Sequence, residues 1–279
     1  MSSIVITGAR GRIAESISTN LEQECGELIR VSRTSGDGCL SLEDAFDGDV
    51  FREASVILHA AWSSVPATSE SHPGIEWRND LPFLARILDS LKDCSKNKPL
   101  FVLLSSAGTV YGNAPGRASL EKDETRPIGW YGRGKVAAET LCNYYSESFG
   151  IPLLILRISN PYGLSSHLNR PQGLISSALQ SAKLGNPLRV WGDGSARKDF
   201  LHCSDLGHAL STAINSRMTG LFNVGYGSSH QVRDVLKIVE QIVGKNLNLD
   251  FTLAPHWDVT DSRICCDSFF AATGWRPSI

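Results

Sequence analysis

The chain has 279 residues, of which 42% are hydrophobic and 20% charged, and its formal net charge at pH 7 is −2. This composition is ordinary for a globular enzyme, and the length suits one large α/β domain or a nucleotide-binding domain with a smaller lobe. A charge so close to zero, without basic runs, indicates no nucleic-acid partner and no membrane surface.

The apolar stretches are too short for a membrane span, because the longest, such as residues 152–158, have the length of a strand. The first residues read as a strand rather than a signal peptide. Seven cysteines are scattered without paired C-x-x-C spacing, which indicates reduced thiols and no metal site. We therefore expect a cytoplasmic protein.

Short apolar runs that suit strands alternate with helix-like segments through the first 160 residues. The expected strands are residues 4–7, 28–32, 56–61, 100–105 and 153–158, and the expected helices run to about residue 24 and over 76–91 and 131–149. This alternation predicts an α/β fold with a Rossmann-type, doubly wound parallel sheet.

The composition changes after Tyr162, where Gly, Asn, Pro and Ser become frequent and the elements become shorter. We expect a Rossmann domain over 1–164 and a smaller, substrate-binding lobe over 165–279. Residues 199–225 are expected to return to the first domain.

A glycine-rich turn follows the first strand, in Thr7-Gly8-Ala9-Arg10-Gly11-Arg12-Ile13-Ala14. Glycines let the backbone approach a pyrophosphate, and the following helix supplies amide donors and the positive end of its dipole. A tight strand-to-helix turn without ligand is the alternative, but the position strictly between strand and helix favours a dinucleotide site.

The second strand ends in Val31-Ser32-Arg33-Thr34, with no acidic residue before Asp37. An acid at this place usually holds the adenosine 2′-hydroxyl of NAD, whereas Ser32 and Arg33, with Arg10, suit a 2′-phosphate. The cofactor is therefore NAD(P), with NADP slightly favoured. The alternative is that the arginine is an exposed loop residue that binds no phosphate.

Tyr131 and Lys135 are spaced to lie one turn apart on one face of a helix. A phenol has an ordinary pKa of about 10 and is a poor base near neutral pH. A neighbouring ammonium would lower that pKa, so the pair is a candidate for proton transfer. The alternative is an amphipathic helix with a surface lysine and a half-buried tyrosine.

Four further segments join the glycine turn and the Tyr-x-x-x-Lys pair in a family pattern, namely residues 104–112 (LSSAGTVYG), 156–163 (LRISNPYG), 170–175 (RPQGLI) and 190–200 (VWGDGSARKDF). In order and spacing the chain resembles the extended short-chain dehydrogenases/reductases, specifically the NAD-dependent epimerase/dehydratase group with UDP-glucose 4-epimerases. The resemblance implies action at C4 of a UDP-hexose through a transient 4-keto sugar, in surface-polysaccharide synthesis. It also implies a homodimer through helices near 76–91 and 131–149.

The resemblance further implies roles for single residues. Tyr131 would be the general base and acid, and Lys135 would bind the nicotinamide ribose. The dinucleotide would be lined by Gly8, Arg10, Gly11, Arg12, Ile13, His59, Ala60 and Ala61. Apart from the resemblance, we also expect Ser32, Arg33 and Ser105 at the dinucleotide. The nucleotide-sugar would be bound by Asn160, Val190, Arg197 and Lys198.

The chain departs from the family pattern at several places. The Ser or Thr expected four residues before Tyr111 is Ala107, so Ser106 or Thr109 would have to supply that hydroxyl. Lys198 stands where relatives carry Arg, and a lysine cannot bind phosphate through a bidentate fork. Relatives carry an Arg shortly before an Asp such as Asp258, and this chain does not. Relatives also continue past residue 279, so the substrate lobe is expected to be lightly capped.

Two rival functions stay open at this point. An NADPH-dependent reductase of nucleoside-diphosphate 4-keto sugars needs only Tyr131, Lys135 and the cofactor. A non-catalytic dinucleotide-binding module would explain Ala107 and Lys198. A 4,6-dehydratase is disfavoured, because Ala107-Gly108 replaces the Asp-Glu pair that eliminates water in relatives.

Overall fold

The computed structural model describes residues 3–94, 98–114, 116–164 and 173–279. Seven parallel strands form its main sheet, in the order β10-β6-β5-β4-β1-β2-β3. They are β1 (Ile4–Thr7), β2 (Leu28–Ser32), β3 (Cys39–Ser41), β4 (Val56–His59), β5 (Leu100–Ser106), β6 (Leu153–Ile158) and β10 (Gly220–Val224). The predicted Rossmann-type parallel sheet is confirmed.

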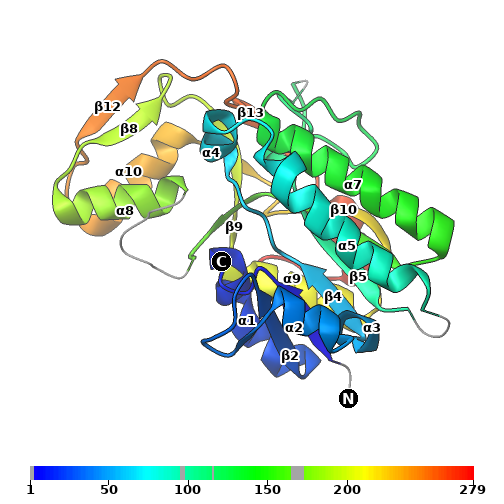
Figure 1. Cartoon of the computed structure of the whole chain (residues 1–279). Helices are drawn as coiled ribbons and strands as arrows, with labels where there is room; N and C mark the ends of the chain where they lie inside the picture. The colour runs from blue at the N-terminus through cyan, green and yellow to red at the C-terminus, as the bar shows by residue number, and fades with distance from the viewer. Residues whose placement is uncertain (1–2, 95–97, 115, 165–172) are drawn as a thin grey trace.

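Helices cover both faces of this sheet, which is why β1, β4 and β6 are buried along their whole length. One face packs against α1 (Arg12–Cys25), α9 (Cys203–Asn215) and α11 (Asp267–Thr273). The other face packs against α2 (Leu42–Asp47), α3 (Val50–Glu53), α5 (Leu81–Lys92) and α7 (Trp130–Phe149). Figure 1 shows α5 and α7 side by side on this second face.

The order in which strands are added to the sheet reverses at β1. The chain builds β2 and β3 on one side of β1 and then returns to place β4 on the other side, with Thr7 opposite His59. Ligands of open α/β sheets bind beyond the carboxyl ends of the strands at such a switch point. The fold therefore directs attention to the residues that follow β1 and β4.

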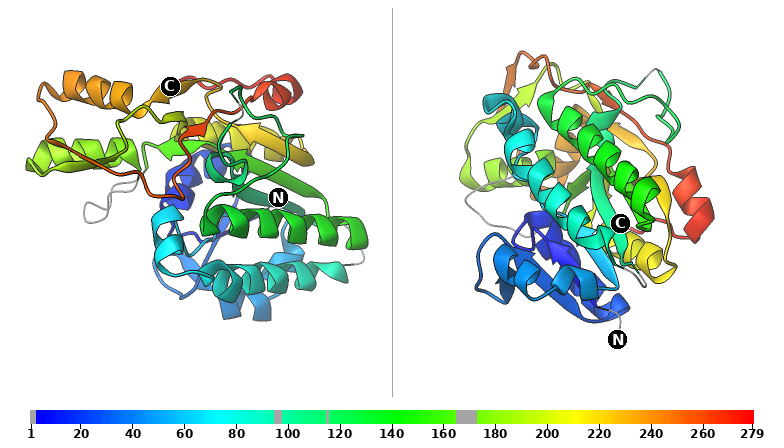
Figure 2. Two further views of the ribbon diagram at one scale, coloured as in Figure 1. Left: turned by 90° about the horizontal axis from the view of Figure 1, so that it is seen from above. Right: turned by 45° about the vertical axis from the view of Figure 1, so that its right-hand side comes forward.

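A small lobe, defined here as α8 (Leu174–Leu184), β8 (Leu188–Trp191), α10 (Val232–Val243) and β12 (Leu249–Thr252), has its own apolar cluster. Figure 2 shows it projecting beyond one end of the main sheet. A second sheet lies between the two parts, made of β7 (Asn160–Tyr162), β9 (Arg197–His202), β11 (Ser229–Gln231) and β13 (Asp261–Ser262). Strand β9 belongs to this second sheet, and α9, which follows it, packs on the main sheet.

Three short helices complete the chain: α4 (Pro66–Ser71), the π-helical turn η1 (Glu76–Asp80) and α6 (Ala107–Val110). None of the helices within the described ranges is long and apolar enough to cross a membrane. All seven cysteines lie within those ranges, and they are free thiols.

Candidate active site

The glycine turn after β1 is closely approached by the segment that follows β4. Gly8 has φ +69°, and a Cβ at this position would lie 2.5 Å from Cα of Ala61. Only glycine tolerates both the backbone angle and the contact. Strand β4 ends at His59, two residues earlier than expected, because Ala60 and Ala61 leave the sheet here.

The amino end of α1 presents backbone donors that suit an anion. Gly11 is the N-cap, and it has no side chain to accept a hydrogen bond from the first turn. Arg12 and Ile13 open the helix, and Ala14 is buried against the sheet. The residues therefore fit the pyrophosphate of a dinucleotide, which backbone amides at a helix N-terminus bind well.

The loop after β2 is organised by Arg10. Its guanidinium donates hydrogen bonds to Oγ1 of Thr34 at 2.9 Å and to two backbone carbonyls of residues 35 and 36. Ser32 is buried and donates to the carbonyl of Thr34 at 2.5 Å, while Arg33 is exposed. The three residues expected at the adenosine ribose thus surround one loop.

His59 lies inside the core rather than on its surface. Its Nδ1 is 3.0 Å from Oγ1 of Thr7, and its ring stacks on Phe101. Burial, followed by the charge of Lys135, lowers the pKa of His59 to about 3, so the ring is neutral. The imidazole therefore supports the floor of the site, and any contact with a dinucleotide would involve the following alanines.

The side chain of Lys135 extends from α7 to the carboxyl-terminal part of β5. Its Nζ donates a hydrogen bond to the carbonyl of Leu104 at 3.0 Å, and the side chain is buried. Burial lowers the pKa of Lys135 to about 7, although the charges of Asp80 and Glu139 act to raise it. The ammonium is therefore close to the balance between its two protonation states at neutral pH.

Tyr131 lies on the same face of α7, as predicted, but its pKa moves in the opposite direction from the expected one. Burial raises the pKa of the phenol, and the charges of Asp80 and Glu76 raise it further. The expectation that Lys135 lowers this pKa is wrong for the protein alone. A neutral phenol is the form that donates a proton, and positive charge added beside it would favour loss of that proton to give the phenolate, which is the base.

Two buried acids beside this pair were missed in the sequence. Asp80 accepts hydrogen bonds from the backbone amide of Ser63 at 2.8 Å and from its hydroxyl at 2.7 Å. Glu76 is fully buried and accepts a hydrogen bond from the hydroxyl of Ser64. Both acids lie on η1, and their spacing of one helical turn was the only available signal.

Because Ala107 has no hydroxyl, the candidate hydroxyls at this place are those of Ser106 and Thr109. Ala107 is buried at the start of α6, directly after Ser106 ends β5. Thr109 donates weakly to the carbonyl of Ser106 at 3.4 Å, and its own carbonyl lies 2.7 Å from where a Cβ of Gly132 would be. Thr109 therefore contacts the first turn of α7.

Ser105 is committed to a buried network that was also missed. Its hydroxyl donates to Glu139, which forms a buried ion pair with Arg157 at 2.6 Å. Arg157 also donates to Oη of Tyr111 at 2.9 Å, and Tyr111 donates to Asn223 at 2.7 Å. This network joins α7 to β5, β6 and β10, so it holds the helix of Tyr131 in place.

The residues expected at the nucleotide-sugar are distributed over the second sheet and the small lobe. Asn160 donates to the carbonyl of Asp199 at 2.8 Å and lies against Gly108. Lys198 is half-buried and pairs with Asp258 at 3.2 Å, whereas Arg197 donates to Ser229.

Val190 is 2% exposed in the core of the small lobe. Its side chain is therefore not presented to a ligand. Residues 170–172, part of one family segment, lie outside the described residues.

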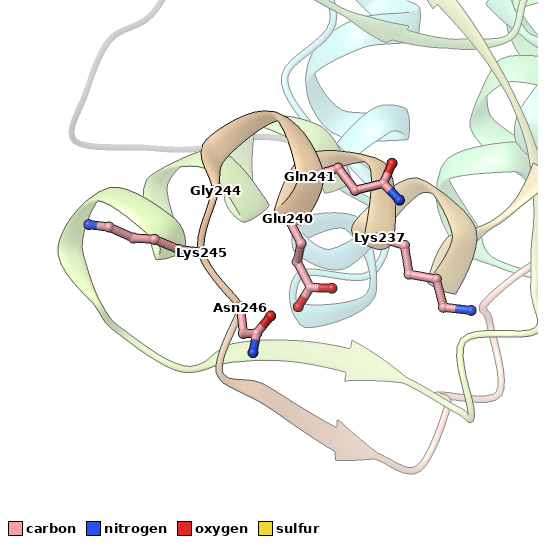
Figure 3. A pocket seen from close by; sticks show the side chains of 6 residues that line it. All are labelled: Lys237, Glu240, Gln241, Gly244, Lys245 and Asn246. Carbon is pink, nitrogen blue, oxygen red and sulfur yellow. The ribbon is translucent and has the colours of Figure 1, made fainter.

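A hollow on the outer part of the small lobe, drawn in Figure 3, contains none of these residues. It is lined by Lys237, Glu240, Gln241, Gly244, Lys245 and Asn246. Glu240 already accepts a hydrogen bond from the amide of Leu247 at 2.8 Å.

The glycine turn, the Tyr–Lys pair and the parallel sheet define an α/β protein of the extended short-chain dehydrogenase/reductase class. Residues 4–225 match the family model described as NAD dependent epimerase/dehydratase family, and the chain belongs to this family.

Two curated relatives illustrate the range of the family. An uncharacterized UDP-glucose epimerase, YtcB, of Bacillus subtilis is 28% identical over 71% of this chain and 61% of its own length. A dTDP-4-dehydro-6-deoxyglucose reductase of Escherichia coli is 28% identical over 64% of this chain and 56% of its own. The chain thus spans about six tenths of the length of these relatives.

Solved structures agree in fold. UDP-glucose 4-epimerase of Thermus thermophilus, in complex with NAD, has a TM-score of 0.88 at 24% identity and covers 99% of this chain and 94% of its own. MoeE5 in complex with UDP-glucose and NAD has a TM-score of 0.89 at 25% identity, with 100% and 94% covered.

Proposed function

We propose that this protein is an NAD-dependent nucleotide-sugar 4-epimerase acting on a UDP-hexose. The observation that carries the proposal is the meeting of three segments at the carboxyl end of the main sheet. Gly8 touches Ala61, and Lys135 binds the carbonyl of Leu104 one turn from Tyr131. The product would serve glycosyl transfer in surface-polysaccharide synthesis.

The residues divide the work as follows. Backbone amides from Gly11 onward hold the pyrophosphate, and Lys135 binds the nicotinamide ribose. A bound nicotinamide dinucleotide would supply the acceptor and donor of hydride for the sugar carbon. Tyr131, once it has lost its own proton, would take the proton of the 4-hydroxyl and later give it back.

The raised pKa of Tyr131 is compatible with this role. The half-buried phenol holds its proton until positive charge lies beside it, so loss of the phenol proton would be coupled to the presence of an oxidised cofactor. Asp80 and Glu76 would oppose a premature phenolate. Ser106 or Thr109 would supply the hydroxyl that Ala107 lacks.

The test is Tyr131→Phe, with Tyr144→Phe on the exposed part of the same helix as a matched control. We expect Tyr131→Phe to retain NAD binding and to lose about a hundredfold or more of UDP-glucose to UDP-galactose turnover. The control should keep its activity. Undiminished turnover in Tyr131→Phe would contradict the proposal.

A second candidate is an NADPH-dependent reductase of a nucleoside-diphosphate 4-keto sugar. It is favoured by Arg33, which is exposed beside Ser32, and by Arg10 at the same loop. Nucleotide released from denatured protein distinguishes the two. Retained NAD supports the epimerase, whereas empty protein that prefers NADPH, and loses this preference in Arg33→Ala, supports the reductase.

The nucleotide-sugar would lie between the two parts of the molecule. Lys198 and Asn160 are the candidate contacts for its diphosphate and sugar. Because Lys198 is paired with Asp258, the diphosphate would have to compete for the ammonium. Lys198→Ala should raise KM for the UDP-sugar more than it lowers kcat.

The proposed homodimer would form through η1–α5 and α7. Four aromatic side chains are exposed along these elements: Trp77, Trp130, Tyr144 and Phe149. Sedimentation equilibrium at micromolar concentration should give a dimer. Tyr144→Glu should weaken it, whereas Phe251→Glu, at an exposed apolar position of the small lobe, should not.

A further inference from the structure

Trp62 lies beside both candidate residues of the active site, yet none of the roles above involves it. It directly follows Ala61, the residue that touches Gly8. Its ring centroid is 3.8 Å from Nζ of Lys135 and 6.4 Å from the ring of Tyr131, which it meets edge to face at 80°.

The position of the indole is tightly constrained by α7. A Cβ at Gly134 would lie 3.2 Å from Cζ2 of Trp62 and 2.8 Å from Cγ of Glu76. The helix backbone therefore lies directly on the indole and the acid. Leu104 accepts the hydrogen bond of Lys135, and the indole face contacts the same ammonium.

The contact matters because Lys135 has a long, flexible side chain and acidic neighbours. Asp80 and Glu139 both attract its charge, and they are held by Ser63 and Arg157 respectively. A cation over an aromatic face is bound more strongly when it is removed from water, as this ammonium is. Without the indole, the ammonium would be free to turn toward the acids and away from the phenol.

We propose that Trp62 is a positioning residue, whose indole face holds the ammonium of Lys135 and whose T-shaped contact sets the ring of Tyr131. The proposal rests on the proposed function, in which this pair carries out the reaction. Trp62 therefore acts through two other side chains.

The chain offers a conservative replacement at this position. Nε1 of Trp62 is buried and has no hydrogen-bond partner among the described residues. Trp62→Phe therefore keeps an aromatic face and loses no hydrogen bond, whereas Trp62→Leu removes the face. Phe251→Leu, at an exposed aromatic position of the small lobe, is the matched control.

Steady-state kinetics with UDP-glucose and titration with NAD test the proposal. We expect Trp62→Leu to lower kcat about tenfold while KM and the dissociation constant of NAD change less than about threefold. Trp62→Phe should recover most of kcat, and Phe251→Leu should match the unmodified protein. Equal losses in the Leu and Phe variants would mean that Trp62 only fills space, which would overturn the proposal.

Fluorinated tryptophan incorporated at position 62 alone separates positioning from folding. Fluorine withdraws electron density from the face and changes its size little, so kcat should fall stepwise with each added fluorine. Unchanged kcat across this series would overturn the proposal even if Trp62→Leu fails to fold. If kcat is unchanged across the fluorinated series but Tyr131→Phe is inactive, only the role of Trp62 is contradicted and the proposed function stands. If Tyr131→Phe is active, the proposed function itself is contradicted.

Discussion

Glu70 of α4 accepts a hydrogen bond from the backbone amide of Trp130 at 2.7 Å. Trp130 is the first residue of α7 and directly precedes Tyr131, and the N-cap Gly129 has no side chain to fulfil this role. A carboxylate from a helix 60 residues earlier in the sequence therefore caps the helix that carries Tyr131 and Lys135. It also complements the positive end of that helix dipole.

The cap should contribute to both stability and positioning. Glu70→Ala is expected to lower the free energy of unfolding by about 1 kcal/mol, the usual effect of losing an N-cap. Glu70→Gln keeps an acceptor and should lose less. Urea denaturation measures both, and equal stability in all three proteins would show that the amide of Trp130 is satisfied in another way.

The ion pair between Glu139 and Arg157 should be among the most sensitive positions in the core. Both side chains are 6% exposed, so removing one partner leaves an uncompensated buried charge. Glu139→Ala is expected to lower the free energy of unfolding by about 3–5 kcal/mol. Glu43→Ala, which breaks a solvent-exposed pair with Arg86, should lower the free energy of unfolding far less.

Lys135 predicts a particular dependence of stability on pH. Its pKa is about 7 in the folded protein, against 10.5 for an ordinary lysine. Between these values the unfolded chain binds more protons than the folded one, so the contribution of Lys135 to stability rises with pH. Below pH 7 both states are protonated, and the full cost of burying the ammonium applies.

This dependence is measured by comparison with Lys135→Met. The stability of Lys135→Met relative to the unmodified protein should be highest near pH 6 and should decline from pH 7 to 9.5. Lys92→Met, at an exposed lysine, should show a constant difference. A difference for Lys135→Met that does not vary with pH would contradict the lowered pKa.

Gly8 should be irreplaceable for two separable reasons. Gly150 has φ +66° and open space around it, so Gly150→Ala tests the backbone angle alone, at about 1–2 kcal/mol. Gly8→Ala adds a collision with Ala61 and should cost more, with loss of NAD binding. Calorimetry of NAD binding to both variants checks this, and tight binding by Gly8→Ala would show that the turn is not the cofactor site.

Features that depend on local spacing could be predicted from the sequence. The parallel sheet follows from alternating strand and helix patterns, and the Tyr131–Lys135 face follows from the helical repeat. The glycine turn was recognisable because Gly8 and Gly11 follow a buried strand directly. The family pattern depends on the same kind of local order and needed no tertiary information.

Only the tertiary structure decided the electrostatics of the site. Trp62, Glu76 and Asp80 reach Tyr131 and Lys135 from more than 50 residues away along the chain, because α4, η1 and α5 pack against α7. Sequence spacing predicted a lowered phenol pKa from one neighbour in the same helix. Burial and two acids from another element determine the direction instead, since the cost of removing charge from water depends on everything packed around it.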